Sequence, residues 1–238
     1  MTKLTTVDFT PPPDFPTAIY NQLHVYINKY MDTHKAQWFQ FGMGWNGLAY
    51  RYRAAAEYDN EFTISIKQSG NSPPPEERYK QGTFLFGFFA NAVSVIECFF
   101  FSAYFMASIL KPNEFPFSES DELKNINPQY VASSFTQYFP KITLIHEMTK
   151  CIRADKYKQI YDMRNVLSHR GMLPRKFYRG GERDGMTTMP INPKDTSNNW
   201  QYDFPVDEQT TATYLHWLSD TLKLLVESSL DFCTQQLP

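Results

Sequence analysis

The stretch at residues 157–173, YKQIYDMRNVLSHRGML, decides how the rest of this 238-residue chain is interpreted. Its apolar residues recur at the three- and four-residue spacing of a helix. Gly171 and then Pro174 supply a stop signal, so the spacing predicts a helix of about four turns. The expected apolar stripe consists of Tyr157, Ile160, Tyr161 and Leu167.

Three polar residues lie near the end of this predicted helix: Arg164, Asn165 and His169. At about 100° per residue, Asn165 and His169 fall on one line of the helix, and Arg164 lies within roughly 140° of His169. The three side chains can therefore face one cleft.

The run Arg-Asn-Val-Leu-Ser-His at residues 164–169 resembles the signature of HEPN (higher eukaryotes and prokaryotes nucleotide-binding) domains. That signature is an arginine, usually a polar residue, and a histidine after a short gap, late in a helix of an all-α bundle. Three further features agree with it: a long apolar helix that carries Glu97 upstream, a helical chain throughout, and His-Arg-Gly at the end of the helix. The resemblance is specific from Glu97 and across the helix to Gly171.

The resemblance implies a function and partners. HEPN proteins are typically dimers, and many are metal-independent ribonucleases of toxin–antitoxin, phage-defence and RNA-processing systems. We therefore expect an endoribonuclease without a cofactor or metal, acting on RNA or nucleotides as a homodimer, with an antitoxin protein as a further partner. The alternative is a non-catalytic HEPN-like nucleotide- or RNA-binding or dimerisation module, in which Arg164 and His169 complement the negative end of the helix dipole.

Each candidate catalytic residue has an expected role. RNA carries its own nucleophile, the 2′-hydroxyl, so His169 is suited to be the general base or acid. Arg164 would hold the scissile phosphate and stabilise its growing charge. Asn165 would position the phosphate or fix the His169 tautomer, and Ser168 could hydrogen-bond nearby. By resemblance, Glu97 would orient Arg164 or take part in proton transfer, although a structural ion pair is an equal alternative. One histidine per chain is an incomplete acid/base pair, which a dimer would complete.

Charge and cysteine content narrow the class of protein. With a net charge of −2, the chain as a whole does not attract nucleic acid, so RNA binding must come from a local positively charged patch. The 20 Phe and 15 Tyr residues favour a folded globule. The three cysteines are far apart, and no charged-then-apolar signal segment precedes the first helix, so we expect a reducing cytoplasm with neither disulfides nor a zinc site. The cysteines are Cys98, Cys151 and Cys233.

A local basic patch follows the key helix. Residues 173–205 are poor in apolar periodicity and rich in Gly, Pro, Asn and Asp, which is typical of a long functional loop. The loop opens with cations interleaved with aromatic rings, a pattern that suits a phosphate backbone and a stacked base. A basic loop balanced by acidic neighbours is the structural alternative. The predicted RNA-binding residues are Arg170, Arg175, Lys176, Tyr178 and Arg179.

The overall pattern predicts an all-α helical bundle of about six to seven helices, with a long central apolar helix and a long loop before the C-terminal helix. Residues 1–16 are expected to form an extended Pro-rich arm, and residues 17–238 a single HEPN-like domain with the loop as an insertion. The apolar run at 84–110 is long enough to form a membrane-spanning helix, which is the alternative interpretation. A polar stripe in its middle favours the centre of a soluble bundle and no membrane partner. That stripe consists of Asn91, Ser94 and Glu97.

Several smaller features complete the prediction. Gly42, Gly44 and Gly47 match Gly-x-Gly-x-x-Gly, but residues 35–40 continue a helix and not a buried strand. We therefore predict a glycine-rich turn between two helices rather than a dinucleotide site. The remaining expectations are a helix from residue 17 to about 38, a helix at 48–66 whose end could form a short strand, short helices at 129–139 and 142–152, and a last helix from Asp207 to about residue 235.

Overall fold

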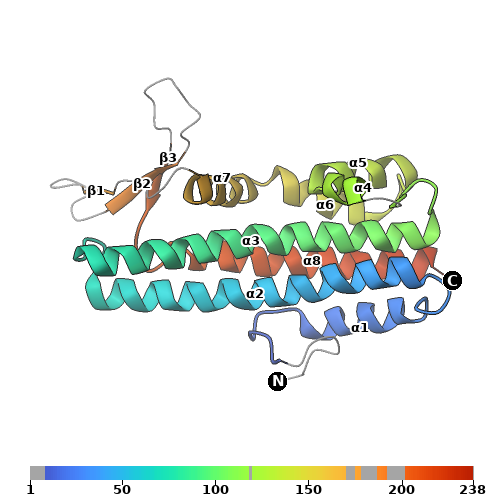
Figure 1. The fold of residues 1–238 in the computed structure, drawn as a ribbon, viewed down its shortest axis with the longest axis horizontal. Helices are drawn as coiled ribbons and strands as arrows, with labels where there is room; N and C mark the ends of the chain where they lie inside the picture. The colour runs from blue at the N-terminus through green and yellow to red at the C-terminus, as the bar shows by residue number, and fades with distance from the viewer. Residues whose placement is uncertain (1–8, 118–119, 170–174, 178–186, 192–201, 238) are drawn as a thin grey trace. The chain divides into compact units, whose positions relative to one another are not determined.

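The computed structural model describes residues 9–117, 120–169, 175–177, 187–191 and 202–237 and forms an all-α bundle, as predicted (Figure 1). Eight helices occur in this described part of the chain, with one small sheet formed by parts of the region predicted as a long loop. The helices are α1 Thr17–Asn28, α2 Lys35–Ser69, α3 Pro75–Leu110, α4 Ser120–Asn125, α5 Pro128–Tyr138, α6 Thr143–Arg153, α7 Asp155–His169 and α8 Ala212–Gln236. The strands are β1 Lys176–Phe177, β2 Thr187–Ile191 and β3 Tyr202–Pro205.

The chain divides into two compact units, and three helices contribute residues to both. The first unit consists of residues 1–53, 94–154 and 219–238. The second unit consists of residues 54–93 and 155–218. The shared helices are α2, α3 and α8.

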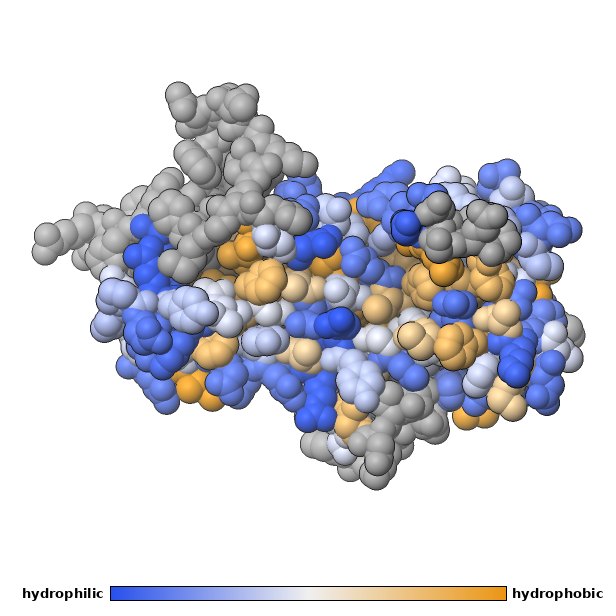
Figure 2. Space-filling model, viewed as in Figure 1, coloured by the Kyte–Doolittle hydropathy of each residue, from blue (hydrophilic) through white to orange (hydrophobic). Residues whose placement is uncertain are grey.

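The long apolar helix is α3, with 36 residues. Among the described residues it is the one helix long and apolar enough to cross a membrane, and 61% of its most apolar 18-residue window is buried within the protein. Length and composition alone are weak evidence for a membrane span, because the core helix of a soluble protein passes the same test. On the face shown in Figure 2, hydrophilic side chains interrupt the hydrophobic ones along the bundle. Within the expected polar stripe, Asn91 is buried and its amide donates to the Gly87 carbonyl 2.7 Å away.

The glycine-rich turn was a wrong prediction, because Gly42, Gly44 and Gly47 all lie inside the continuous 35-residue helix α2. Two of them permit close packing instead. A Cβ on Gly44 would lie 2.5 Å from the Ser102 hydroxyl oxygen, and one on Gly47 would lie 3.0 Å from the Cys98 sulfur. The motif therefore brings α2 close to α3 within the first unit, and it follows no strand, as the sequence indicated.

The break between the first two helices comes earlier than predicted. α1 ends at Asn28, a turn occupies residues 29–34, and α2 begins at Lys35. The Trp38 indole donates to the Asn28 side-chain oxygen over 2.9 Å and so ties the start of α2 to the end of α1. The Tyr20 ring stacks on Trp45 at 4.5 Å, and its hydroxyl donates to the Trp45 carbonyl over 2.8 Å. These contacts fix α1 along α2 in the first unit.

Two segments differ from the prediction in their strand content. Residues 62–66 are helical, because burial of Phe62, Ser65 and Ile66 follows the helical spacing and not the alternation of a strand. Part of the region predicted as a long loop forms a three-stranded antiparallel sheet in the order β1-β2-β3. Its register pairs Phe177 with Thr187 and Met189 with Phe204.

The short helices were predicted well. α5 and α6 coincide with the expected segments, and Asn127 caps α5 by accepting a 3.0 Å hydrogen bond from the Tyr130 amide. Helix α4, at Ser120–Asn125, lies in a segment for which no helix was predicted. The last helix begins at Ala212, because Asp207 caps the preceding turn through a 2.8 Å bond from the Gln209 amide.

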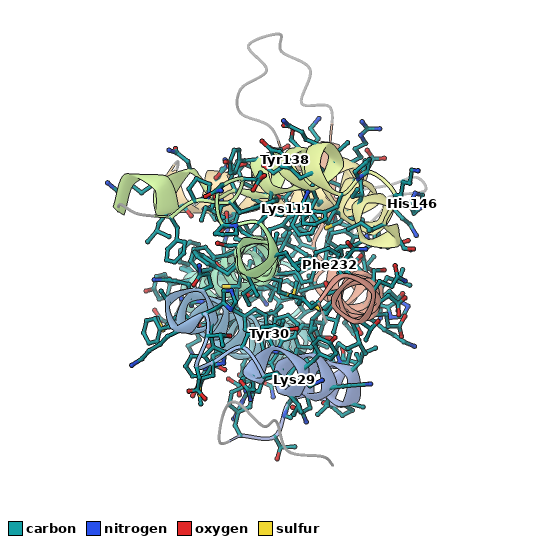
Figure 3. The ribbon with its side chains drawn as sticks, turned by 90° about the vertical axis from the view of Figure 1, so that its right-hand side faces the viewer. Lys29, Tyr30, Lys111, Tyr138, His146 and Phe232 are labelled. Carbon is teal, nitrogen blue, oxygen red and sulfur yellow. The ribbon has the colours of Figure 1, made fainter. Side chains whose placement is uncertain are left out.

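Aromatic packing closes one end of the first unit, and Figure 3 shows Lys111 next to Tyr138 there. The Lys111 ammonium donates to the Tyr138 carbonyl over 3.0 Å and lies 4.9 Å from the centre of the Phe139 ring. The Phe139 ring meets Phe232 of α8 edge-on at 5.0 Å. The cation thus covers the end of an aromatic core that joins α5 to α8.

Candidate functional site

Helix α7, which carries the HEPN-like residues, buries a different stripe from the one predicted. The buried residues of α7 repeat every three positions: Tyr157, Ile160, Met163 and Val166. Tyr161, expected in the core, is 39% exposed, and Leu167 is only half-buried. The prediction was right about the helix and its start and wrong about its orientation.

The position of the polar residues follows from this stripe. At about 100° per residue, Asn165 lies about 170° from the centre of the buried stripe, whereas position 169 lies about 60° beyond Val166, the last residue of that stripe. Asn165 is half-buried and Ser168 is exposed. Asn165 and His169 are four residues apart in one continuous helix, so they share the face that the sequence predicted.

Arg164 lies between this face and the buried stripe, about 100° around the helix from Asn165. Its side chain is half-buried, and its guanidinium carbon lies 4.9 Å from the centre of the Tyr161 ring. Stacking of an arginine on an aromatic ring holds the planar group in one orientation. Tyr161 is therefore a candidate positioning residue that the sequence interpretation assigned to the core.

Helix α7 is fixed to the start of α8 within the second unit. The Tyr214 hydroxyl donates to the Gln159 side-chain oxygen over 2.9 Å, and the Lys156 ammonium donates to the Thr213 carbonyl over 3.3 Å. Burial raises the pKa of Tyr214 to about 12, so its hydroxyl stays protonated and can donate. The Tyr214 ring also packs at 5.6 Å on Phe89 of α3. These contacts give α7 a rigid base.

Glu97 belongs to the first unit, whereas Arg164 and His169 belong to the second. It is half-buried on α3, and both it and Arg51 of α2 act electrostatically on the neighbouring thiol of Cys98. Burial, the larger effect, raises the pKa of Cys98 to about 11. The pairing of Glu97 with Arg164 remains a prediction.

Arg175, predicted to bind RNA, is anchored to the protein through one nitrogen. Its Nη1 donates to the Asn71 carbonyl over 2.9 Å and to the Gln81 side-chain oxygen over 2.7 Å. Burial, together with the positive charge of Arg78, lowers the pKa of Arg175 to about 10. Asn71, Arg78 and Gln81 were missed because they lie about a hundred residues before Arg175 in the chain, and nothing in their local sequence marks them.

Of the other predicted RNA-binding residues, only Lys176 lies within the described part of the chain. Lys176 lies in β1, and its backbone pairs with Thr188. Arg170, Tyr178 and Arg179 lie outside the described residues. In the described ranges, no group of three or more His, Cys, Asp or Glu side chains is arranged to hold a metal ion.

Comparison of the chain with protein-family models, curated proteins and solved structures finds no match. The chemistry of the site therefore has to be argued from its own residues. Within the last six residues of α7 they comprise a guanidinium, an amide and an imidazole. Such a set can bind a phosphate and exchange a proton with a group beside it.

Proposed function

We propose that this protein is a metal-independent endoribonuclease of the toxin or phage-defence type, acting in the cytoplasm as a homodimer and held in check by an antitoxin protein. What supports the proposal is the position of Arg164, Asn165 and His169 within the last six residues of α7, with Asn165 and His169 four residues apart on one line of the helix. Together with the resemblance to HEPN domains, it favours RNA as the substrate. The proposal needs no cofactor.

The chemistry requires only proton transfer and stabilisation of charge. His169 takes the proton of the 2′-hydroxyl, the 2′-oxygen attacks the adjacent phosphorus, and the bond to the 5′-oxygen of the next nucleotide breaks. The leaving 5′-oxygen receives a proton, which in our proposal comes from His169 of the second copy. The products are a 2′,3′-cyclic phosphate and a 5′-hydroxyl.

Two neighbouring residues assist this reaction. The Arg164 guanidinium holds the non-bridging oxygens of the phosphate and stabilises the charge that grows on them. The Tyr161 ring under the guanidinium restricts its orientation. Asn165, one turn before His169, donates to the phosphate or fixes the tautomer of the imidazole.

The test is incubation of purified protein with mixed cellular RNA in EDTA, followed by chemical analysis of the fragment ends. We expect 2′,3′-cyclic phosphate ends with the wild type and, for His169→Ala, a cleavage rate lower by about 10²- to 10⁴-fold, the usual contribution of a general acid or base. His146→Ala is the matched control, because the His146 side chain is 76% exposed on α6 of the first unit. Equal cleavage by His169→Ala and the wild type would contradict the assigned role.

The second candidate is a non-catalytic HEPN-like module that binds RNA or nucleotides or mediates dimerisation. The stacking of Arg164 on Tyr161 favours it, because the contact gives the arginine a role in packing that needs no RNA. In that case His169→Ala lowers the unfolding midpoint, and a folded wild-type dimer cleaves none of a varied set of RNAs.

A further inference from the structure

The anchor of Arg175 is built into the fold of the second unit. Gln81 is fully buried, and while its oxygen accepts from Arg175, its nitrogen donates to the Gly70 carbonyl over 3.0 Å. Gly70 follows α2 with a φ of +68°, a left-handed conformation that favours glycine at the end of a helix. One buried amide thus joins the turn between α2 and α3 to the Arg175 guanidinium, which is held in a fixed place.

A second guanidinium lies beside this anchor. Arg78 precedes Gln81 by three residues on α3, so the two side chains are neighbours on one face of the helix. Arg78 is half-buried, and its charge acts on Arg175. Two half-buried guanidinium groups that share the neighbour Gln81 repel each other unless an anion lies between them.

Among the described residues, neither guanidinium has a carboxylate partner. Both hydrogen bonds of Arg175 to the described residues leave from Nη1, so its Nε and Nη2 have no acceptor in this part of the chain. Arg78 has no side-chain acceptor in the same part, and the nearby Glu77 is occupied by Lys80 at 2.7 Å. Arg78 also lies in the first turn of α3, where the helix dipole favours an anion.

We propose that Arg78 and Arg175 together bind one backbone phosphate of the RNA, as a subsite separate from the reacting groups on α7. The proposal rests on the proposed ribonuclease function and names how that function holds its substrate. A phosphodiester presents two non-bridging oxygens, and an arginine fork can grip them through two parallel hydrogen bonds. The phosphate also supplies the negative charge that the two arginines lack among their described neighbours.

The test measures binding separately from cleavage. Fluorescence anisotropy of a labelled 12-nucleotide oligouridine follows binding to His169→Ala protein, which leaves the RNA intact. Arg78→Gln and Arg78→Lys are added to this background. Arg153→Gln is the matched control, since it removes the same charge from an exposed position on α6 of the first unit.

We expect Arg78→Gln to weaken binding by about 10- to 100-fold, the usual loss for a hydrogen bond to a charged group. The slope of log affinity against log salt should fall by about 0.7, the value for one phosphate contact on a single strand. Arg78→Lys should recover part of the affinity, because it keeps the charge but loses the fork. Arg153→Gln should leave affinity and slope unchanged, and circular dichroism checks that all variants fold alike.

Other outcomes contradict either the phosphate subsite or the ribonuclease proposal. If Arg78→Gln binds the RNA as tightly as the background protein does, the proposed subsite does not exist. If Arg78→Gln loses binding of inorganic phosphate, measured by calorimetry, but keeps its affinity for RNA, the site takes free phosphate and not the backbone. If the wild type cleaves RNA while Arg78→Gln binds it normally, only the subsite fails. If the wild type cleaves nothing while Arg78→Gln loses RNA affinity, the ribonuclease proposal fails and the phosphate site stands.

Discussion

Replacing Gly44 by alanine tests whether the glycines of α2 exist for close helix packing. A Cβ at this position would lie 2.5 Å from the Ser102 hydroxyl oxygen, 2.9 Å from a Phe101 ring carbon and 3.1 Å from the Cys98 carbonyl oxygen. The hydroxyl can rotate away and the ring can shift. The carbonyl belongs to the backbone of α3, so it moves only if that helix moves.

The magnitude follows from a comparison with a nearby glycine. Gly42 lies two residues earlier in α2, and a Cβ there meets no atom within 4 Å. Gly42→Ala should therefore stabilise the protein by about 0.5 to 1 kcal/mol, the helix-propensity gain of alanine over glycine. Gly44→Ala makes the same gain but forces atoms together, at about 1 to 3 kcal/mol. Because the propensity gain cancels between the two variants, their difference equals the packing cost.

Urea unfolding followed by far-ultraviolet circular dichroism measures this difference, with equal m-values as the check that both variants unfold alike. We expect Gly42→Ala to unfold at a higher urea concentration than the wild type, and Gly44→Ala at a lower one. Ser102→Ala in the Gly44→Ala background should return part of the loss, since it removes the nearest atom. Equal midpoints for the two glycine variants would show that α2 and α3 do not approach each other as described.

Three further predictions concern other parts of the chain. Gly87→Ala should lower the unfolding midpoint, because its Cβ would lie 2.5 Å from the Tyr58 ring, and Gly87→Ala with Tyr58→Leu should be closer to the wild type in the same urea assay. Burial raises the pKa of Cys151 to about 12, so this thiol should react with a disulfide reagent at pH 8 only after denaturation, as absorbance of the released thiolate would show. Burial, followed by the hydrogen bond to Asp14 at 2.6 Å, raises the pKa of Tyr52, so stability should fall above pH 10, where the unfolded tyrosine ionises and the folded one does not. Tyr52→Phe should lose less stability between pH 9 and pH 11 in pH-dependent urea titrations.

The sequence predicted well which segments are helical, but it predicted poorly which residues pack against one another. Helical spacing and the proline before each start indicated α5 and α6 almost to the residue, because those signals are local. The glycine motif was misread, because glycine at a turn and glycine under a crossing helix look the same in one dimension. What separates them at Gly44 is Ser102, 58 positions away in the chain. Only the folded structure brings that atom to 2.5 Å from where a Cβ would be.

The candidate site divides in the same way. The shared face of Asn165 and His169 was predicted, since four residues of one helix suffice to define it. The anchor of Arg175 was not, because its acceptors come from the turn between α2 and α3 and from Gln81. A cation in a basic loop is expected to contact solvent or ligand, and nothing near Arg175 in sequence indicates a buried amide as its partner.

The orientation of α7 has a consequence for any reaction at its end. The buried residues step by three, and each step turns the stripe by about 60° around the helix, so the stripe sweeps over one side between Tyr157 and Val166. Position 169 continues the same three-residue step, about 60° beyond Val166, whereas Asn165 lies on the side opposite the centre of the stripe. The proposed proton transfer needs a second acid or base beside that face, and in our proposal it comes from His169 of another copy of the chain.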